Sequence, residues 1–210
     1  MTLSFKRKPK YHIKAIFFDI GGVICKDIEK YMMRDIAKKY NIPYEKIMKI
    51  RSKWWRLYSK DKISEKEYWN GVLKDTRIQE DYTHFLFLPY KIYIREIPHM
   101  KKILETLAKR YNLYVLSDHS KDWWDYAKNK FQLQKYFQGY ILSFEYGILK
   151  DDQKLFLKAL KLAKVNPQEA LFIDNSPKNI LVAKSLGIQT LLFINQKQLA
   201  RELKNSKLLY

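Results

Sequence analysis

The sequence predicts an α/β protein whose core is a doubly wound parallel sheet, with a helical module inserted after the first strand. Short apolar runs recur along the chain, segments with helical periodicity separate them, and one long stretch carries helical patterns alone. Continuous apolar runs are what strands covered on both faces require. Their alternation with helices is typical of a parallel sheet with helices on both sides.

Five of these runs are the expected strands. They lie at residues 13–18, 113–116, 139–142, 170–173 and 190–193. The helices between them carry boundary signals. Asp152 is placed to cap a helix at 153–164, while Ser176 and Pro177 open another that Gly187 closes.

The stretch from Asp27 to Ile97 differs from the rest because it contains helical patterns and little that resembles a strand. One face of its first helix is expected to carry Ile28, Tyr31, Met32, Ile36 and Tyr40. Pro43 opens a second helix, and a capping-box pattern at Ser64 opens a third. We therefore expect a basic N-terminal arm at residues 1–10, a core at 11–26 and 98–210, and a helical cap at 27–97.

Composition limits the cellular context. With 47% hydrophobic residues the chain is expected to fold, and none of its apolar runs approaches the ~20 residues of a membrane span. The basic start lacks the apolar stretch of a secretory signal. Cys25 is the single cysteine, which excludes an internal disulfide and a cysteine-based metal cage. A cytoplasmic location is therefore expected, with no membrane partner.

The charge balance is strongly basic, with 41 Lys and Arg against 22 Asp and Glu and a net charge of +19. Such a protein attracts polyanions, so nucleic acid is one candidate partner. The lysines are nevertheless spread through every helix, and neither helix-turn-helix spacing nor paired Cys and His appears. We favour a compositional bias over a dedicated nucleic-acid site. The sequence does not indicate an oligomeric state.

Polar residues follow four of the expected strands. They are Asp19, Gly21 and Gly22 after the first, Ser117 and Asp118 after the second, Lys150 in the loop beyond the third, and Asp174 and Asn175 after the fourth. In an open parallel sheet, ligands bind beyond the carboxyl ends of the strands, so these residues are expected to converge. Taken singly, Ser117 is typical of a turn, and the Asp174–Asn175 pair of a helix cap.

Together these residue types suit phosphoryl transfer. A carboxylate such as Asp19 can attack phosphorus and form an aspartyl-phosphate that water hydrolyses. Because both groups are anionic, Mg²⁺ with oxygen ligands is the expected cofactor. The expected substrate-binding groups are Gly21, Gly22, Ser117, Asp118 and Lys150, of which the glycines offer backbone N–H groups and Lys150 neutralises developing charge.

The sequence resembles the haloacid dehalogenase superfamily, whose four motifs occur in order over residues 13–194. Asp19-Ile20-Gly21-Gly22-Val23 resembles the first motif, and residues 174–179 resemble the acidic fourth motif. Ser117 and Lys150 match the hydroxyl of the second motif and the lysine of the third. The insertion resembles the helical cap of the subgroup that includes sugar-phosphate phosphatases.

The resemblance implies roles for these residues. Asp19 is the expected nucleophile, assisted by Ser117 and Lys150. The expected metal ligands are Asp19, the Gly21 carbonyl, and Asn175 or Asp174. In the cap, some of Arg51, Trp55, Arg56 and Tyr58 could face the substrate.

Two positions depart from the usual pattern of this superfamily. Most of its phosphatases carry a second Asp two residues after the nucleophile as general acid and base, a contribution typically worth about 10²–10⁴-fold. This chain has Gly21 there, as D-x-G-[GN]-V variants of the sugar-phosphatase-like branch do. Asn175 stands where an acidic metal ligand is usual, and an uncharged amide is expected to bind Mg²⁺ more weakly.

The expected function is hydrolysis of a small phosphomonoester by a Mg²⁺-dependent phosphatase. Two alternatives stay open. One is a metal-independent dehalogenase that uses Asp19 on carbon. The other is a non-catalytic member that binds a partner or nucleic acid through its positive surface. His119 is not expected to take part, although it follows Ser117 closely.

Overall fold

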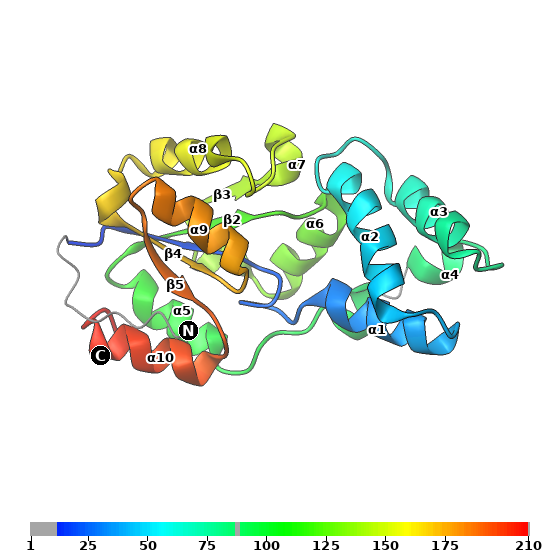
Figure 1. Cartoon of the computed structure of the whole chain (residues 1–210). Helices are drawn as coiled ribbons and strands as arrows, with labels where there is room; N and C mark the ends of the chain where they lie inside the picture. The colour runs from blue at the N-terminus through cyan, green and yellow to red at the C-terminus, as the bar shows by residue number, and fades with distance from the viewer. Residues whose placement is uncertain (1–11, 87–88, 210) are drawn as a thin grey trace.

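The computed structural model of the chain describes residues 12–86 and 89–209, and the expected arm at 1–10 lies outside them. A five-stranded parallel sheet in the order β3-β2-β1-β4-β5 confirms the predicted fold class (Figure 1). The strands are β1 (Ala15–Phe18), β2 (Asn112–Ser117), β3 (Gly139–Leu142), β4 (Ala170–Asp174) and β5 (Gln189–Leu192). Strand order reverses at β1, where ligand sites of doubly wound folds form.

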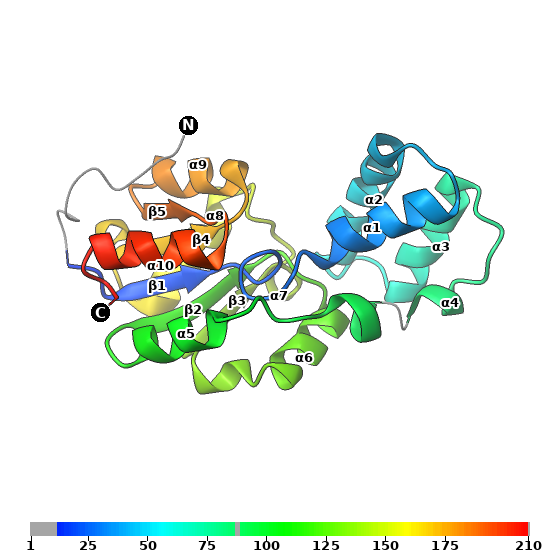
Figure 2. The same ribbon diagram turned by 90° about the horizontal axis from the view of Figure 1, so that it is seen from below.

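Helices cover both faces of this sheet. Along β1, Ile16 and Phe18 pack into one hydrophobic cluster while Ala15 and Phe17 pack into another, and all four are buried. The helices on the first face are α5 (Met100–Ala108), α6 (Lys121–Lys130) and α10 (Gln196–Asn205), and those on the second are α8 (Gln153–Ala163) and α9 (Pro177–Ser185) (Figure 2). Burial on both sides explains why the strands are continuously apolar.

The expected helix boundaries in the core are confirmed with one correction. The Asp152 side chain caps α8 by accepting the Lys154 N–H at 2.9 Å, and Gly187 follows α9 with φ +81°. Ser176 occupies the cap position of α9, but its side chain makes no capping hydrogen bond. Its backbone N–H instead donates to the Asp174 carboxylate at 2.6 Å. This bond fixes the turn between β4 and α9.

The predicted inserted helices follow β1 and lie at one end of the molecule (Figures 1 and 2). They are α1 (Ile28–Lys39), α2 (Tyr44–Tyr58), α3 (Glu65–Thr76), the short α4 (Thr83–Leu86) and a π-helical turn, η1 (Pro89–Tyr93). The capping box of Ser64 and Glu67 is present. The expected apolar face of α1 is only partly buried, since Tyr31 is 38% exposed while Met32 is fully buried.

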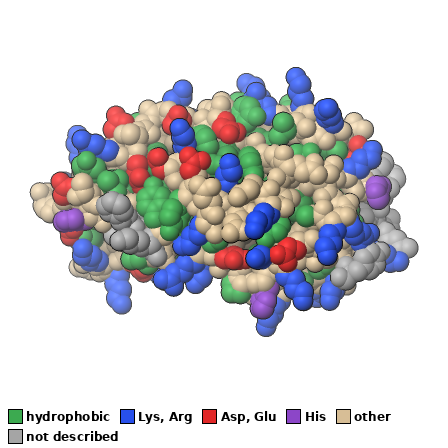
Figure 3. Space-filling model, turned by 180° about the vertical axis from the view of Figure 1, so that it is seen from behind, with side chains coloured by type: hydrophobic (Ala, Val, Ile, Leu, Met, Phe, Trp, Pro, Cys, Tyr) green, Lys and Arg blue, Asp and Glu red, His purple; other side chains and the backbone are tan. Residues whose placement is uncertain are grey.

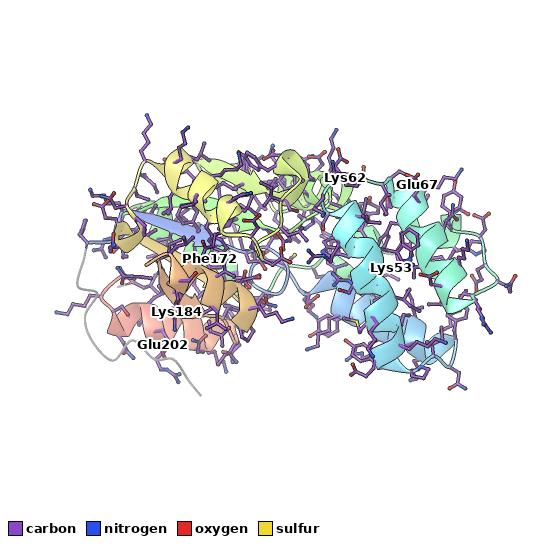
Figure 4. The ribbon with its side chains drawn as sticks, turned by 45° about the horizontal axis from the view of Figure 1, so that its top comes forward. Lys53, Lys62, Glu67, Phe172, Lys184 and Glu202 are labelled. Carbon is purple, nitrogen blue, oxygen red and sulfur yellow. The ribbon has the colours of Figure 1, made fainter. Side chains whose placement is uncertain are left out.

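Close approach of α2 and α3 depends on Gly71. A Cβ at this position would lie 2.3 Å from the ring of Trp54, so the indole packs directly on the backbone of α3. The Trp54 indole N–H donates to Asp75 at 2.9 Å, and Lys53, labelled in Figure 4, pairs with the same oxygen at 2.8 Å. These contacts make α2 and α3 one packed unit.

Two chain crossings join the insertion to the core. The Lys26 N–H donates to the Arg95 carbonyl at 2.8 Å, and the Ile97 N–H donates to the Ile24 carbonyl at 3.0 Å. The remaining elements are α7 (Ser143–Tyr146) and the 3₁₀ turns η2 (Leu133–Lys135) and η3 (Pro167–Glu169). In the described part of the chain, no helix combines the length and the apolar character that crossing a bilayer requires.

Candidate active site

Lys150 is the centre of a buried ionic cluster at the carboxyl ends of β1 and β4. Its Nζ lies 2.6 Å from Asp19 Oδ1 and 2.7 Å from Asp174 Oδ2, and its side chain is only 2% exposed. The same nitrogen lies 5.8 Å from the ring centroid of Phe172, which is labelled in Figure 4. A buried ammonium is tolerated when carboxylates pair with it, and here two do so.

Asp19 is held by both neighbouring strands. Its backbone N–H donates to the Ile173 carbonyl at 3.0 Å, and the Ser117 hydroxyl donates to its Oδ1 at 2.7 Å. Burial raises the pKa of Asp19 to about 7, although the Lys150 ammonium acts in the opposite direction. Burial thus favours the neutral form of this carboxyl group, and the neighbouring ammonium favours the ionised form.

Asp174 is fully buried and both of its oxygens are engaged. Oδ2 accepts from Lys150 and, at 3.0 Å, from the amide of Asn179, while Oδ1 accepts the Ser176 N–H. These contacts suit a residue that positions Lys150. Asn179 is a site residue that we did not select from the sequence, although it ends the 174–179 motif. Its position in the first turn of α9 aims its side chain back toward the strand end.

Asp118 completes the set of carboxylates around Lys150. Its Oδ1 accepts the backbone N–H of Lys150 at 2.9 Å, which fixes the loop that carries the lysine. Burial raises the pKa of Asp118 to about 6. Burial also opposes the ammonium charge of Lys150, yet the carboxylates of Asp174, Asp19 and Asp118 together raise the pKa of this lysine.

The loop after Asp19 brings Gly22 against the fourth motif. Gly22 has φ +81°, and a Cβ there would lie 2.2 Å from Nδ2 of Asn175, so only glycine fits without displacing this amide. The Gly22 N–H donates to the Cys25 carbonyl at 2.7 Å. A Cβ at Gly21 would meet nothing within 4 Å. The structure thus joins Asp19, Ser117, Asp118, Lys150 and Asp174 in one set of contacts and places Gly22 against Asn175.

The donors at this edge fit a hard divalent cation. Three carboxylates, those of Asp19, Asp118 and Asp174, surround the single ammonium of Lys150, so the cluster carries excess negative charge. The expected ligands, Asp19, the Gly21 carbonyl, and Asn175 or Asp174, can each offer oxygen, which Mg²⁺ prefers. Among the described residues no three His, Cys, Asp or Glu side chains form a metal-binding group. A metal site at this edge would therefore use the Gly21 carbonyl and the Asn175 amide oxygen beside the carboxylates.

Ser143 links this edge to the insertion and was missed from the sequence. Its Oγ accepts the His119 N–H at 3.0 Å and donates to the Ser59 carbonyl at 2.5 Å. Ser143 follows β3 directly, so the search for polar residues at strand ends would have found it. His119 is buried, and its Nδ1 donates to the Ser120 carbonyl at 3.1 Å. Burial lowers the pKa of His119 to about 4.

A second set of contacts fastens the inserted helices to α6, and we call it the Trp123 cluster. Its rings are Trp55, Tyr58, Tyr68 and Trp123. The Trp123 indole N–H donates to Glu65 at 2.9 Å, and the Tyr58 hydroxyl donates to Asp122 at 3.1 Å. Ring centroids of Trp55 and Trp123 are 5.4 Å apart. Two residues expected to be candidates for facing the substrate, Trp55 and Tyr58, thus contact the core.

The other two expected cap residues are cationic. Arg56 pairs with Asp151 at 2.5 Å, across the boundary between insertion and core. The Arg51 guanidinium lies 5.0 Å from the ring of Trp55. Burial lowers the pKa of Arg51, and the carboxylates of Asp27 and Asp118 oppose this shift. Tyr68 opposes the shift more strongly than either carboxylate, and of the two only Asp118 lies at a strand end.

Comparison with known proteins decides the family. The chain matches the haloacid dehalogenase-like hydrolase family over residues 18–193, which is most of its length. It belongs to this family of hydrolases. The resemblance seen in the four sequence motifs is confirmed.

Two characterised proteins are among those similar to this chain. Flavin mononucleotide hydrolase 1 of Arabidopsis thaliana, named as a chloroplast protein, is 23% identical over 209 residues, covering 97% of this chain and 80% of that protein. Glyceraldehyde 3-phosphate phosphatase of Pyrococcus abyssi is 33% identical over 105 residues, covering 48% of this chain and 43% of that protein.

A solved structure shares the fold. The HAD family enzyme bt-2542 of Bacteroides thetaiotaomicron aligns with a TM-score of 0.75 at 20% identity, covering 91% of this chain and 98% of that chain. The same enzyme has been solved in complex with magnesium and inorganic phosphate.

Proposed function

We propose that this chain is a Mg²⁺-dependent phosphatase that hydrolyses a small phosphomonoester through an aspartyl-phosphate on Asp19. The observation that carries the proposal is the buried cluster of Asp19, Ser117, Lys150 and Asp174 at the switch point of the sheet. Two relatives are named for hydrolysis of phosphorylated small molecules, and bt-2542 binds magnesium and phosphate. Both findings agree with this chemistry.

In the first step the Asp19 carboxylate attacks phosphorus, so that an Asp19–phosphorus bond forms while the ester bond breaks. The Ser117 hydroxyl and the Lys150 ammonium, which contact Asp19 directly, are placed to hold the phosphoryl oxygens. Asp174 and Asp118 hold the side chain and the backbone of Lys150 in place. Asp19, the Gly21 carbonyl, and Asn175 or Asp174 would hold Mg²⁺, which would reduce the repulsion between carboxylate and phosphate.

In the second step water attacks the phosphorus and releases Asp19. Residues 27–97 are proposed as the cap that excludes bulk water, over a core of residues 11–26 and 98–210. Among the cap residues, Arg51 is proposed to contribute positive charge near the substrate, since the strand-end carboxylate of Asp118 is one of the groups that raise its pKa, after Tyr68 and Asp27. The cytoplasmic location expected from the single cysteine stays a prediction.

A panel of phosphate esters with and without Mg²⁺ tests the proposal. Phosphate release should require Mg²⁺, stop on addition of EDTA and return when Mg²⁺ is restored. The Asp19→Asn variant is the control. Activity that survives in this variant would contradict the assignment of the nucleophile.

Two further assays distinguish the proposed phosphatase from the dehalogenase and from the non-catalytic member. Halide release from 2-haloacids in the presence of EDTA would assign the dehalogenase instead. Salt-dependent retention on nucleic acid without any turnover would favour the non-catalytic alternative. The Lys and Arg side chains are scattered over the face shown in Figure 3, with acidic side chains between them. That distribution agrees better with compositional bias than with one dedicated patch.

A further inference from the structure

A hollow of about 310 Å³ lies where the two chain crossings join the insertion to the core, and we call it the junction hollow. The insertion contributes the start of α1, the core contributes the loop between β5 and α10, and Ile97 and Pro98 of the second crossing also line it. Its volume lies at the lower end of the range typical of small-molecule sites. Asp19, Ser117 and Lys150 are not among its described lining residues, so it is distinct from the phosphoryl-binding groups.

Apolar side chains from both parts of the molecule face this hollow. Tyr31, from the insertion, is 38% exposed, and Ile194, from the core, is 57% exposed. Phe193 lines the hollow beside them but is itself buried. Covering apolar surface that faces water is favourable. A ligand with an apolar body would cover Tyr31 and Ile194 together, because both line the same concave surface.

Two ammonium groups make the junction hollow positive. Lys26 and Lys30 line it, and neither forms an ion pair with a carboxylate in the described part of the chain. The Lys26 Nζ lies 5.9 Å from the ring centroid of Tyr31. Asp27 is the one carboxylate among the described lining residues, and its Oδ1 accepts the Lys30 N–H at 3.1 Å. The hollow therefore favours an anion.

The inner wall of the junction hollow adjoins the fourth motif. Gly22 and Asn175 line it, and the Asn175 amide packs so closely on Gly22 that a Cβ there would lie 2.2 Å from Nδ2. Asn175 follows the buried Asp174 directly. A ligand in the hollow would therefore contact the insertion, the core and this amide at the same time.

We infer that the junction hollow binds a small organic anion, in which an apolar or aromatic body carries one carboxylate, sulfonate or phosphate group. The body covers Tyr31 and Ile194, and the anionic group meets the ammonium groups of Lys26 and Lys30. Inorganic phosphate lacks the body and a neutral molecule lacks the charge, so each gains only half of these contacts. The site is additional to the one proposed for hydrolysis.

Two probes with the same rings test this assignment on the full-length protein. The anionic probe is 8-anilinonaphthalene-1-sulfonate, and its neutral counterpart is N-phenyl-1-naphthylamine, which lacks the sulfonate. We expect saturable binding of the sulfonate, measured by its fluorescence, with a Kd about 3–30-fold lower than that of the neutral probe, as two exposed ion pairs would give. The difference should shrink at high salt.

Variants of exposed residues locate the bound probe. Lys26→Gln/Lys30→Gln should raise the Kd of the sulfonate by about 3–30-fold and leave the neutral probe unaffected. Ile194→Asp should raise the Kd of both probes by about tenfold, because it removes apolar surface from the wall. Circular dichroism checks that each variant is folded.

A neighbouring hollow of about 370 Å³ between α5 and α10 supplies the matched control. Lys102 and Lys204 line it, so Lys102→Gln/Lys204→Gln removes the same charge from a different place. Leu181→Asp, at a position on α9 that is 63% exposed, is the control for Ile194→Asp. Both controls should leave the Kd of the sulfonate within about twofold.

Equal effects of the two double lysine variants would overturn the inference, since net charge alone would then explain binding. Absence of saturable binding by the unmodified protein would overturn it as well. The sulfonate should leave the KM for a phosphate ester unchanged, and a KM that rises in proportion to its concentration would place the probe in the substrate site and contradict a separate one. Absence of hydrolysis would contradict the proposed function alone, because the binding measurements do not depend on turnover.

Discussion

The Lys150 cluster and the Trp123 cluster are both buried where the sheet meets the inserted helices, but different forces hold them. Around Lys150, three carboxylates and one ammonium lie at strand ends, and each charge depends on its neighbours for compensation. Around Trp123, four rings with centroids between 5.1 and 6.3 Å apart bury apolar area. Only a few hydrogen bonds, such as that to Glu65, orient them.

Because different forces hold the two clusters, substitutions in them should have different effects. Removal of one partner from a buried ion pair leaves an uncompensated charge, so loss of one member harms the whole set. Aromatic contacts depend on shape and area, and loss of one ring or one hydrogen bond is felt locally. The ionic cluster should therefore govern catalysis, and the aromatic cluster should govern attachment of the insertion. Substitutions in the ionic cluster are therefore expected to have larger effects than substitutions in the Trp123 cluster.

Asp19→Asn is expected to lower turnover by at least ~10⁴-fold, because removal of a nucleophile removes the step that it carries out. Asn keeps the shape of Asp and can still accept the Ser117 hydroxyl, so the fold should persist. Phosphate release measures the loss, and circular dichroism checks the fold. Turnover within tenfold of the unmodified protein would show that the ionic cluster is not the catalytic centre.

Lys150→Met should cost about 3–5 kcal/mol of unfolding free energy, because Asp19 and Asp174 lose the ammonium that compensates their buried charge. Turnover should be lost as well. Urea unfolding gives the free energy. Lys161→Met, on the exposed side of α8, is the matched control and should change stability by less than ~0.5 kcal/mol. Equal midpoints for the two variants would contradict the ionic account.

His119 is buried next to Ser143 and Trp124, and its protonation should destabilise the protein in acid. Its pKa falls to about 4 on folding from an ordinary value of 6.5, so the unfolded chain binds the proton first as the pH drops. The resulting stability is fully present above pH 6.5 and is lost toward pH 4, to a total of about 3 kcal/mol.

Urea unfolding between pH 4 and 7 measures this loss. In His119→Asn the steepness of the decline should fall, whereas His99→Asn, at an exposed position, should leave the decline unchanged. A decline of equal steepness in the His119 variant and the unmodified protein would remove this residue from the account.

Trp123→Phe should cost about 1–3 kcal/mol, because Glu65 loses the indole N–H that it accepts inside the interface. Phosphate release should persist, since the ionic cluster is untouched. Glu65→Gln, which keeps an acceptor oxygen, should cost less, and urea unfolding ranks the two. Loss of turnover with unchanged stability would mean that this cluster shapes the site itself.

Much of the fold could be predicted because a local run of apolar residues marks each strand. The apolar runs at 13–18 and 170–173 require burial on both faces, and Ser64 signals the start of α3 by its own hydrogen bonds. The exposure of Tyr31 could not be predicted in the same way. Its position on α1 is compatible with burial, and only the packing of the neighbouring helices leaves it 38% exposed.

The candidate site likewise contains residues that could be chosen from the sequence and residues that were not. Asp19, Ser117 and Lys150 could be chosen from the sequence because a parallel sheet brings strand ends to one edge. Asn179 and Ser143 were not chosen, although Asn179 closely follows β4 in the chain and Ser143 directly follows β3. The contact between Ser143 and the Ser59 carbonyl could not be predicted, because only tertiary packing brings these remote segments together.

The sequence by itself determined the strand-end chemistry of this protein, its family resemblance and the glycine beside the nucleophile, because covalent order fixes which residue follows each strand. Only the tertiary structure decided that Lys150 is shared between Asp19 and Asp174, that the volume at Gly21 is empty, and that Trp123 lies among rings of the insertion. These are properties of distances between remote segments, and those distances exist only after the chain has packed.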